Sequence, residues 1–315
     1  MFNAWDSPHF QLIAQNGYAH PDYAFLPAYP ILIRIVGGLL GNYWVAGFLL
    51  AQFFSLASVV MFQLTAELYM DRKQALYATA LMVTFPYLFV FTTLSYSEPL
   101  FLFSTVATWY FYKKKQVGVS AILAGIASVT KIYGIGIVVP IIVDIVHSKR
   151  YRALAYLVAP IASLTSWFVY CYFSAGDPLA TWADEQWYAS NILSKLGVVQ
   201  TIFDQLSKGL STTSGKVPYP FIDVPVLLVL CFFGYLVAKT REVDWALATF
   251  PIFVAGGLLL TATNHLALLR LLLFLFPIWL TFRLKNPYSV AACIALFIPV
   301  TIALWMYAIN VTFIG

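Results

Sequence analysis

The sequence has 315 residues, of which 61% are apolar and only 10% are charged, with a net charge of +5. A water-soluble domain carries about 25% charged residues, so the composition excludes that class of protein. Lys and Arg stand in small clusters between long apolar runs, which is typical of cytoplasmic loops and not of a nucleic-acid-binding surface. The sequence therefore predicts an all-α, polytopic membrane bundle that forms a single domain over residues 1–315.

Motifs for soluble nucleotide cofactors are missing from the sequence. It has no phosphate-binding loop, no dinucleotide fingerprint and no Asp-x-Asp pair to hold the metal of a nucleotide sugar. Cys171, Cys231 and Cys293 are scattered through apolar runs without metal-ligand spacing, so we expect free thiols and predict no metal site. By elimination, these absences favour a substrate or donor that is not a nucleotide, and they leave the need for a metal ion open.

The first long segment that is not built for lipid is the opening loop, residues 1–41. Ser7 is predicted to cap a short helix that has Pro8 at its first position and ends at Gly17. A weakly apolar stripe on this helix suits a helix lying on the membrane surface; it consists of Phe10, Ile13, Ala14 and Gly17. Asp6 precedes the cap, and its carboxylate is read with equal weight as a helix cap or as a catalytic base.

Apolar runs long enough, or nearly so, for the roughly 20 residues of a spanning helix follow this loop. They are predicted at 43–68, 75–94, 97–112, 152–174, 223–239, 245–262, 266–283 and 287–311. Two shorter apolar pieces between Lys115 and His147 are broken at 130–134, and together they suggest a broken hairpin. Residues 29–41 are expected to form a short re-entrant or surface segment. The total is about 8–10 transmembrane helices with amphipathic helices on the outer face.

Basic residues give the orientation of the bundle. Twelve of the eighteen Lys and Arg residues fall on one side, which is inferred to be cytoplasmic, and six fall elsewhere. The opening loop, the turn at 95–99, the break at Lys131, a second outer loop at 176–222 and residues 261–265 then share the extracytoplasmic side. Because the chain starts outside, either its first residues are translocated as a tail or a further helix precedes this sequence; we favour the second alternative.

Ionisable groups at this outer face are the candidates for chemistry. Such groups cost about 2.5–3.5 kcal/mol each at membrane depth and tend to be functional. The set consists of Asp6, His9, His20, Asp22, Arg34, Glu98, Lys131, Asp177, Asp184, Glu185, His265 and Arg270. Cations suit the binding of a lipid phosphate and a carboxylate suits the removal of a hydroxyl proton. Some of these residues also have a purely structural interpretation. A glutamate such as Glu98 is favoured at the start of a helix, and the histidines suit hydrogen bonds within loops.

A longer pattern runs through the same segments. It begins with Trp5-Asp6-x-x-His9-Phe10-x-x-Ile13-Ala14-x-x-Gly17-Tyr18 and Ala24-Phe25-Leu26-Pro27-Ala28-Tyr29-Pro30. It continues with Tyr96-Ser97-Glu98-Pro99-Leu100-Phe101, Gly125-x4-Thr130-Lys131-x-x-Gly134, Gly176-Asp177-Pro178-Leu179, Gln186-Trp187 and Leu269-Arg270 before Phe276-Pro277. The opening part resembles the first luminal loop of the PIG-V family, the mannosyltransferases that add the second mannose of GPI anchors, together with their prokaryotic relatives. The compact chain suits a prokaryotic member.

The resemblance implies a GT-C fold, which is an all-helical membrane glycosyltransferase using a polyprenyl-phosphate sugar. Asp6 is then the base that activates the acceptor hydroxyl for inverting attack on the anomeric carbon. Lys131, where the family more often has arginine, is a candidate to hold the lipid phosphate together with Arg270 and His265. The remaining candidates for substrate contact are His9, Glu98, Asp177 and Gln186.

The implied partners are membrane lipid, the lipid-linked sugar and a glycan or glycolipid acceptor on the extracytoplasmic or ER-luminal face. No nucleic acid and no cofactor beyond the donor is expected. The alternative is a non-catalytic transporter of lipid-linked sugars. A transporter of this kind often shows an inverted repeat and helix breaks at mid-membrane, whereas the sequence shows no clear repeat and one pronounced break, at Lys131, toward the outer face.

Overall fold

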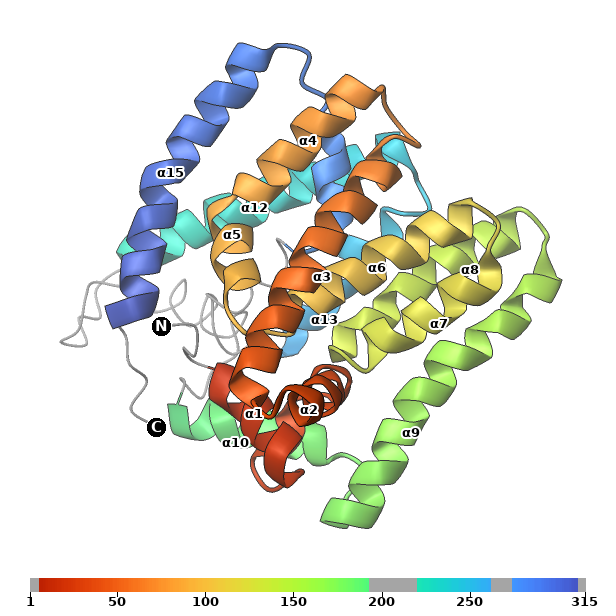
Figure 1. The fold of residues 1–315 in the computed structure, drawn as a ribbon. Helices are drawn as coiled ribbons and strands as arrows, with labels where there is room; N and C mark the ends of the chain where they lie inside the picture. Colours follow the sequence, from red (N-terminus) through yellow and green to blue (C-terminus); the bar gives the residue numbers. More distant parts are fainter. Residues whose placement is uncertain (1–5, 193–219, 262–273, 311–315) are drawn as a thin grey trace.

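The computed structural model describes residues 6–192, 220–261 and 274–310. Within these ranges the chain consists of α-helices and short 3₁₀ helices and contains no strand (Figure 1). This confirms the predicted all-α class. Two of the described helical segments, Tyr43–Ala66 and Tyr151–Ala175, are long and apolar enough to cross a membrane.

Two helices form the centre of the bundle. Helix α3 (Tyr43–Ala66) packs along α6 (Glu98–Lys113), and most of the side chains of α6 are buried, from Leu100 near its start to Trp109 near its end. A helix that is apolar on all sides belongs in a core. The far side of α3 keeps Phe53 and Leu56 exposed at 62% and 70%, as expected for a surface that faces lipid.

The predicted hairpin between Lys115 and His147 is confirmed. Helix α7 (Val117–Ser128) ends before Lys131, which is extended, and the chain returns through the 3₁₀ helix η2 (Ile132–Ile137) into α8 (Val138–His147). Gly134 makes this turn possible, because a Cβ there would lie 2.0 Å from the carbonyl oxygen of Ala127. The break is therefore a close-packed feature of the fold.

The predicted span 75–94 is wrong as a single helix. The structure divides it into α4 (Arg72–Thr84) and α5 (Pro86–Thr93), with Phe85 extended between them. Proline removes a backbone donor and disfavours helical geometry in the residue before it, so Pro86 starts a new helix. Lys131 is consequently not the only pronounced break in the described part of the chain.

Most of the later spans are seen as predicted. The 3₁₀ helix η3 (Tyr151–Leu157) leads into α9 (Val158–Ala175), and the others correspond to α12 (Pro220–Val243), α13 (Thr249–Thr261) and α15 (Pro287–Asn310). For the span 266–283, residues 262–273 lie outside the described ranges. The end of that span is the short 3₁₀ helix η4 (Phe276–Thr281), not a continued α-helix.

The opening loop forms α1 (Ser7–Asn16), η1 (Asp22–Ala24) and α2 (Ala28–Leu40), which lie at the N-terminal end of α3 (Figure 1). Gly17 ends α1 with φ +87°, as predicted. Two other expectations are wrong. Ser7 lies inside the helix, with Asp6 at the cap position, and the stripe of Phe10, Ile13 and Ala14 is buried against protein rather than facing lipid. The outer side of α2 keeps Ile31, Ile35 and Leu39 exposed, in keeping with a surface segment.

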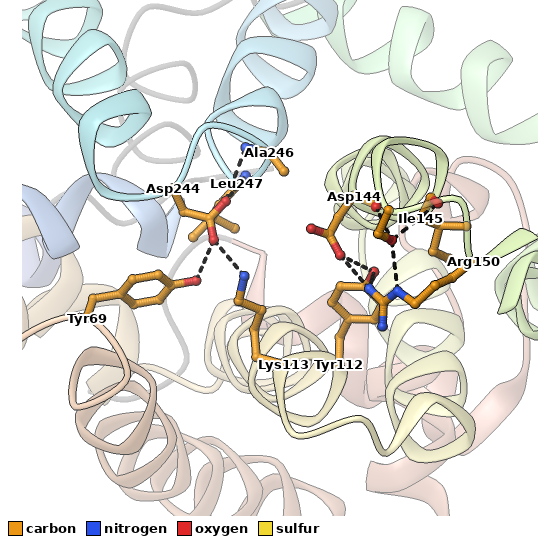
Figure 2. A network of polar contacts seen from close by, with 10 residues as sticks. Tyr69, Tyr112, Lys113, Asp144, Ile145, Arg150, Asp244, Ala246 and Leu247 are labelled. Atoms are coloured by element: carbon orange, nitrogen blue, oxygen red, sulfur yellow. Dashed lines mark hydrogen bonds and ion pairs between the residues drawn. The ribbon is translucent and has the colours of Figure 1, made fainter.

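The loops predicted to be cytoplasmic meet at the other end of α3 and α6, beyond Ala66 and around Lys113. Figure 2 shows the polar contacts between them. Asp244 accepts hydrogen bonds from the hydroxyl of Tyr69 (2.8 Å) and from Nζ of Lys113 (2.9 Å). Beside it, Asp144 accepts from the hydroxyl of Tyr112 and from Nη2 of Arg150, the latter at 2.7 Å. We call these six residues the inner cluster: Tyr69, Tyr112, Lys113, Asp144, Arg150 and Asp244. They connect four of the segments that the distribution of basic residues assigns to the cytoplasmic side.

Candidate functional site

Asp6 is held at the start of α1 by its backbone. Its N–H donates to the hydroxyl oxygen of Tyr96 over 2.8 Å, and its carbonyl accepts from the backbone N–H of His9 over 3.1 Å. The side chain makes no capping hydrogen bond to the first turn of α1. Of the two readings of this carboxylate, the geometry therefore disfavours the helix cap. The contact with Tyr96 joins the opening loop to a segment 90 residues later.

The turn that carries Tyr96 is fixed from the other side by buried polar contacts. Ser95 accepts a hydrogen bond from the side-chain amide of Gln11 over 2.7 Å, and Gly47 of α3 leaves the space for it, since a Cβ there would lie 2.5 Å from the Ser95 hydroxyl. The hydroxyl of Tyr29 donates to the carbonyl of Gly47 over 2.7 Å. Helices α1, α2 and α3 thus set the position of this turn.

Glu98 follows in the same turn and begins α6. Its carboxylate is fully buried, and Oε1 lies 3.2 Å from Nζ of Lys131, whose side chain is 17% exposed. Carboxylates and ammonium groups are buried at this depth only when they are paired. The extended backbone at Lys131 brings the ammonium to Glu98, and the nearby hydrogen bond from the N–H of Ala28 to the carbonyl of Val129 (2.9 Å) ties the same segment to α2.

A second carboxylate stands near Lys131. Glu185 lies on α10 (Ala180–Ile192), and burial raises its pKa to about 7, while the positive charge of Lys131 works in the opposite direction. We call Asp6, Tyr96, Glu98, Lys131 and Glu185 the outer cluster. It is drawn from four distant segments of the chain and combines a cation with three carboxylates.

The other candidates from the sequence lie around this cluster. His9 contacts Asp22, with Nδ1 and Oδ1 2.7 Å apart, and stacks on Phe25 at 4.9 Å between ring centroids. Asp177 is exposed and accepts from the backbone N–H of Leu179 over 2.8 Å, which shapes the turn into α10. Gln186 is exposed on α10. Their roles as substrate contacts stay predictions.

Two candidates, His265 and Arg270, lie in residues 262–273, outside the described part of the chain. Tyr96 was not among the candidates for chemistry in the sequence, and Asp184 and Glu185 were among them without a specific role. Tyr96 stood inside a recognised pattern, and Asp184-Glu185 directly precede Gln186-Trp187, so position beside a motif was the available signal. Among the described residues, no group of three or more His, Cys, Asp or Glu side chains is arranged to hold a metal ion.

Chemically, the outer cluster offers a carboxylate that makes no capping hydrogen bond to α1 and an ammonium in a mostly buried setting. A buried cation attracts an anion more strongly than one in water, because the surrounding dielectric is lower. A carboxylate at such a place takes a proton from a hydroxyl when the two are within hydrogen-bond reach. This combination suits a reaction between a phosphate-bearing lipid and an alcohol.

Comparison with known proteins identifies the family to which the chain belongs. Residues 2–192 match the family described as Mannosyltransferase (PIG-V), which includes all of the outer cluster. A curated protein, GPI alpha-1,6-mannosyltransferase 2 of Cricetulus griseus, is 32% identical over 136 residues. That similarity covers 39% of this chain and 27% of the length of the relative. Since the family match covers more than half of the sequence, the chain belongs to the mannosyltransferase (PIG-V) family.

Proposed function

We propose that this protein transfers mannose from a polyprenyl-phosphate carrier to a hydroxyl group of a glycan or glycolipid. The family match supports the sugar, and the apolar bundle supports a donor that stays in the membrane. The observation that carries the proposal is the outer cluster. The bond from the Asp6 N–H to Tyr96 and the ion pair between Glu98 and Lys131 bring a carboxylate and a cation from distant segments to one end of the bundle.

In the proposed reaction, the carboxylate of Asp6 accepts the proton of the acceptor hydroxyl. The hydroxyl oxygen attacks the anomeric carbon of mannose, and the bond from that carbon to the phosphate oxygen breaks with its electron pair going to the phosphate. The configuration at the anomeric carbon inverts. The product phosphate carries more negative charge than the donor diester, so a nearby cation lowers the barrier.

Lys131 is proposed to supply that cation. Its ammonium is held by Glu98, which is fully buried and stands at the N-terminus of α6. Glu98 in this account fixes the position of Lys131 rather than touching substrate. Arg270 and His265, both outside the described ranges, remain further candidates for the lipid phosphate.

The reaction is proposed to take place on the extracytoplasmic or luminal face. The contacts support this indirectly. The loops that the distribution of basic residues assigns to each side come together in separate clusters, at opposite ends of α3 and α6. The inner cluster lies with most of the basic residues, which favour the cytoplasm. The outer cluster then faces the other side.

The direct test is transfer of labelled mannose from a defined polyprenyl-phosphate mannose by purified protein. We expect transfer by the wild type and a loss of about 100-fold or more in Asp6→Asn, since general base catalysis typically contributes 10²–10⁴-fold. Asp71→Asn is the matched control, because Asp71 caps α4 at the other end of α3. Transfer by Asp6→Asn at the wild-type rate would remove Asp6 from this role, and lipid translocation without transfer would favour the transporter.

A further inference from the structure

Asp184 joins the two outer loops through both of its carboxylate oxygens. Oδ1 lies 2.7 Å from Nδ1 of His20, and Oδ2 accepts a hydrogen bond from the backbone N–H of Tyr23 over 2.9 Å. The side chain of Asp184 is 5% exposed, whereas that of His20 is 58% exposed. A buried carboxylate with two such contacts holds the segment that it binds, because its removal leaves polar groups without partners.

The segment held by Asp184 is connected to the start of α1. Tyr23 belongs to η1, whose first residue, Asp22, contacts Nδ1 of His9 over 2.7 Å. His9 lies in the first turn of α1, and its backbone N–H donates to the carbonyl of Asp6 over 3.1 Å. A path of polar contacts therefore runs from Asp184 through η1 and His9 to Asp6.

The same helix reaches the other half of the outer cluster. Glu185, the residue after Asp184, is influenced by the charge of Lys131. Helix α10 thus touches the Asp6 side of the cluster through Asp184 and approaches the Lys131 side through Glu185. The same helix is also attached to α9, where Nε1 of Trp167 donates to the hydroxyl of Thr181 over 2.8 Å and Phe168 stacks on Trp182. The Trp167 ring in turn packs against Tyr18 of the opening loop, with ring centroids 4.9 Å apart.

We propose that Asp184 is a positioning residue, which clasps the opening loop to α10 and so aligns Asp6 with Lys131 for the transfer step. The inference rests on the proposed function. Asp184 lies away from the reacting atoms and acts through η1 and His9. Loss of the clasp is expected to slow the reaction of bound substrates more than it weakens donor binding, since small misplacements of a reacting group cost rate.

The test combines a structural and a kinetic measurement on the purified full chain. In Asp184→Ala, we expect hydrogen exchange of the peptide covering residues 18–25 to become about 10-fold faster, because the N–H of Tyr23 loses its acceptor. We expect kcat to fall about 10-fold, with the KM for donor within twofold of the wild type. Asp184→Glu, which restores a carboxylate, should recover part of both.

Two further variants separate positioning from general destabilisation. Trp182→Leu removes the stacking of Trp182 on Phe168 in the same helix and keeps the contacts of Asp184 with His20 and Tyr23, so it should lower the melting temperature while kcat and exchange in residues 18–25 stay within twofold. His20→Gln combined with Asp184→Ala should be no slower than Asp184→Ala alone, because two residues that act through one contact are not additive.

The results that would overturn the proposal are the following. Unchanged exchange in Asp184→Ala shows that the clasp does not exist in solution, and faster exchange with an unchanged kcat shows that it is structural only; both overturn the proposal. An equal loss of kcat in Trp182→Leu also overturns it. Absence of transfer in the wild type overturns the proposed function and the positioning role together, while exchange still reports on the clasp itself.

Discussion

The two charged clusters at opposite ends of α3 and α6 are built from similar residues but in different ways. In the inner cluster, each oxygen of the Asp244 carboxylate is used: Oδ2 binds Tyr69 and Lys113, and Oδ1 accepts from the backbone N–H groups of Ala246 and Leu247 (Figure 2). In the outer cluster, Lys131 is 3.2 Å from one carboxylate and near a second whose pKa is raised to about 7.

This difference indicates that the inner cluster stabilises the fold, whereas the outer cluster is arranged to bind a ligand. Hydrogen bonds that saturate a buried carboxylate fix a single arrangement and leave no attraction for a further group. A carboxyl group whose pKa is about 7 is only about half ionised at pH 7, which leaves more of the positive potential of Lys131 for an arriving anion than a fully ionised carboxylate would. The comparison predicts that mutations in the inner cluster change stability, whereas those in the outer cluster change donor use.

The largest effect on stability is expected for Asp244→Asn. The side chain of Asp244 is 9% exposed and that of Lys113 is 31% exposed, and breaking such a pair costs about 3 kcal/mol, the lower end of the range for buried pairs. The measurement is thermal unfolding in detergent. Mannose transfer per folded molecule should stay within twofold of the wild type, and a large loss of transfer without loss of stability would break the comparison.

The next effect is the donor dependence of Lys131→Gln. If Lys131 binds the donor phosphate, the KM for polyprenyl-phosphate mannose should rise about 10-fold or more, since charge-assisted hydrogen bonds are worth about 1.5–3 kcal/mol. Lys131→Arg should keep most of the affinity. Lys131→Gln leaves Glu98 buried without its cation, so the decisive variant also carries Glu98→Gln. A donor KM equal to that of the wild type in this double variant would show that Lys131 has only a structural role.

The smallest effect concerns Glu185 and pH. Burial raises the pKa of folded Glu185 from 4.5 to about 7, so as pH rises through this window the unfolded chain loses the proton first and stability falls. Glu185→Gln does not titrate. Its melting temperature should match the wild type near pH 5 and exceed it by a few degrees at pH 8, since 1 kcal/mol corresponds to roughly 2–4 °C. A constant difference across this range would contradict the raised pKa.

The long helices could be predicted from the sequence because apolar length is a direct requirement of the membrane. The break at Lys131 could also be predicted, because a charged residue and Gly134 interrupt an apolar run. The break at Pro86 was missed because the apolar run continues through it. The buried stripe of α1 was assigned to lipid because apolar side chains look the same whether lipid or protein covers them.

The partners within the site could not be predicted in the same way. Asp184 and Tyr23 are 161 residues apart, and nothing local in either segment encodes their contact. The pattern around Asp6 identified the loop, but its bond to Tyr96 and the pairing of Glu98 with Lys131 depend on how α3 and α6 pack. Sequence thus indicated which residues carry charge at this face, and the packing decides which of them meet.

The account depends on the end of the bundle that holds Asp6 facing away from the cytoplasm. The most direct measurement is labelling by a membrane-impermeant maleimide in intact bacterial cells that express a cysteine-free chain with one new cysteine. Gln15 of α1 and Lys114 after α6 are both exposed. We predict that Gln15→Cys is labelled in intact cells and that Lys114→Cys is labelled only after permeabilisation. Labelling of Lys114→Cys with protection of Gln15→Cys would contradict the account.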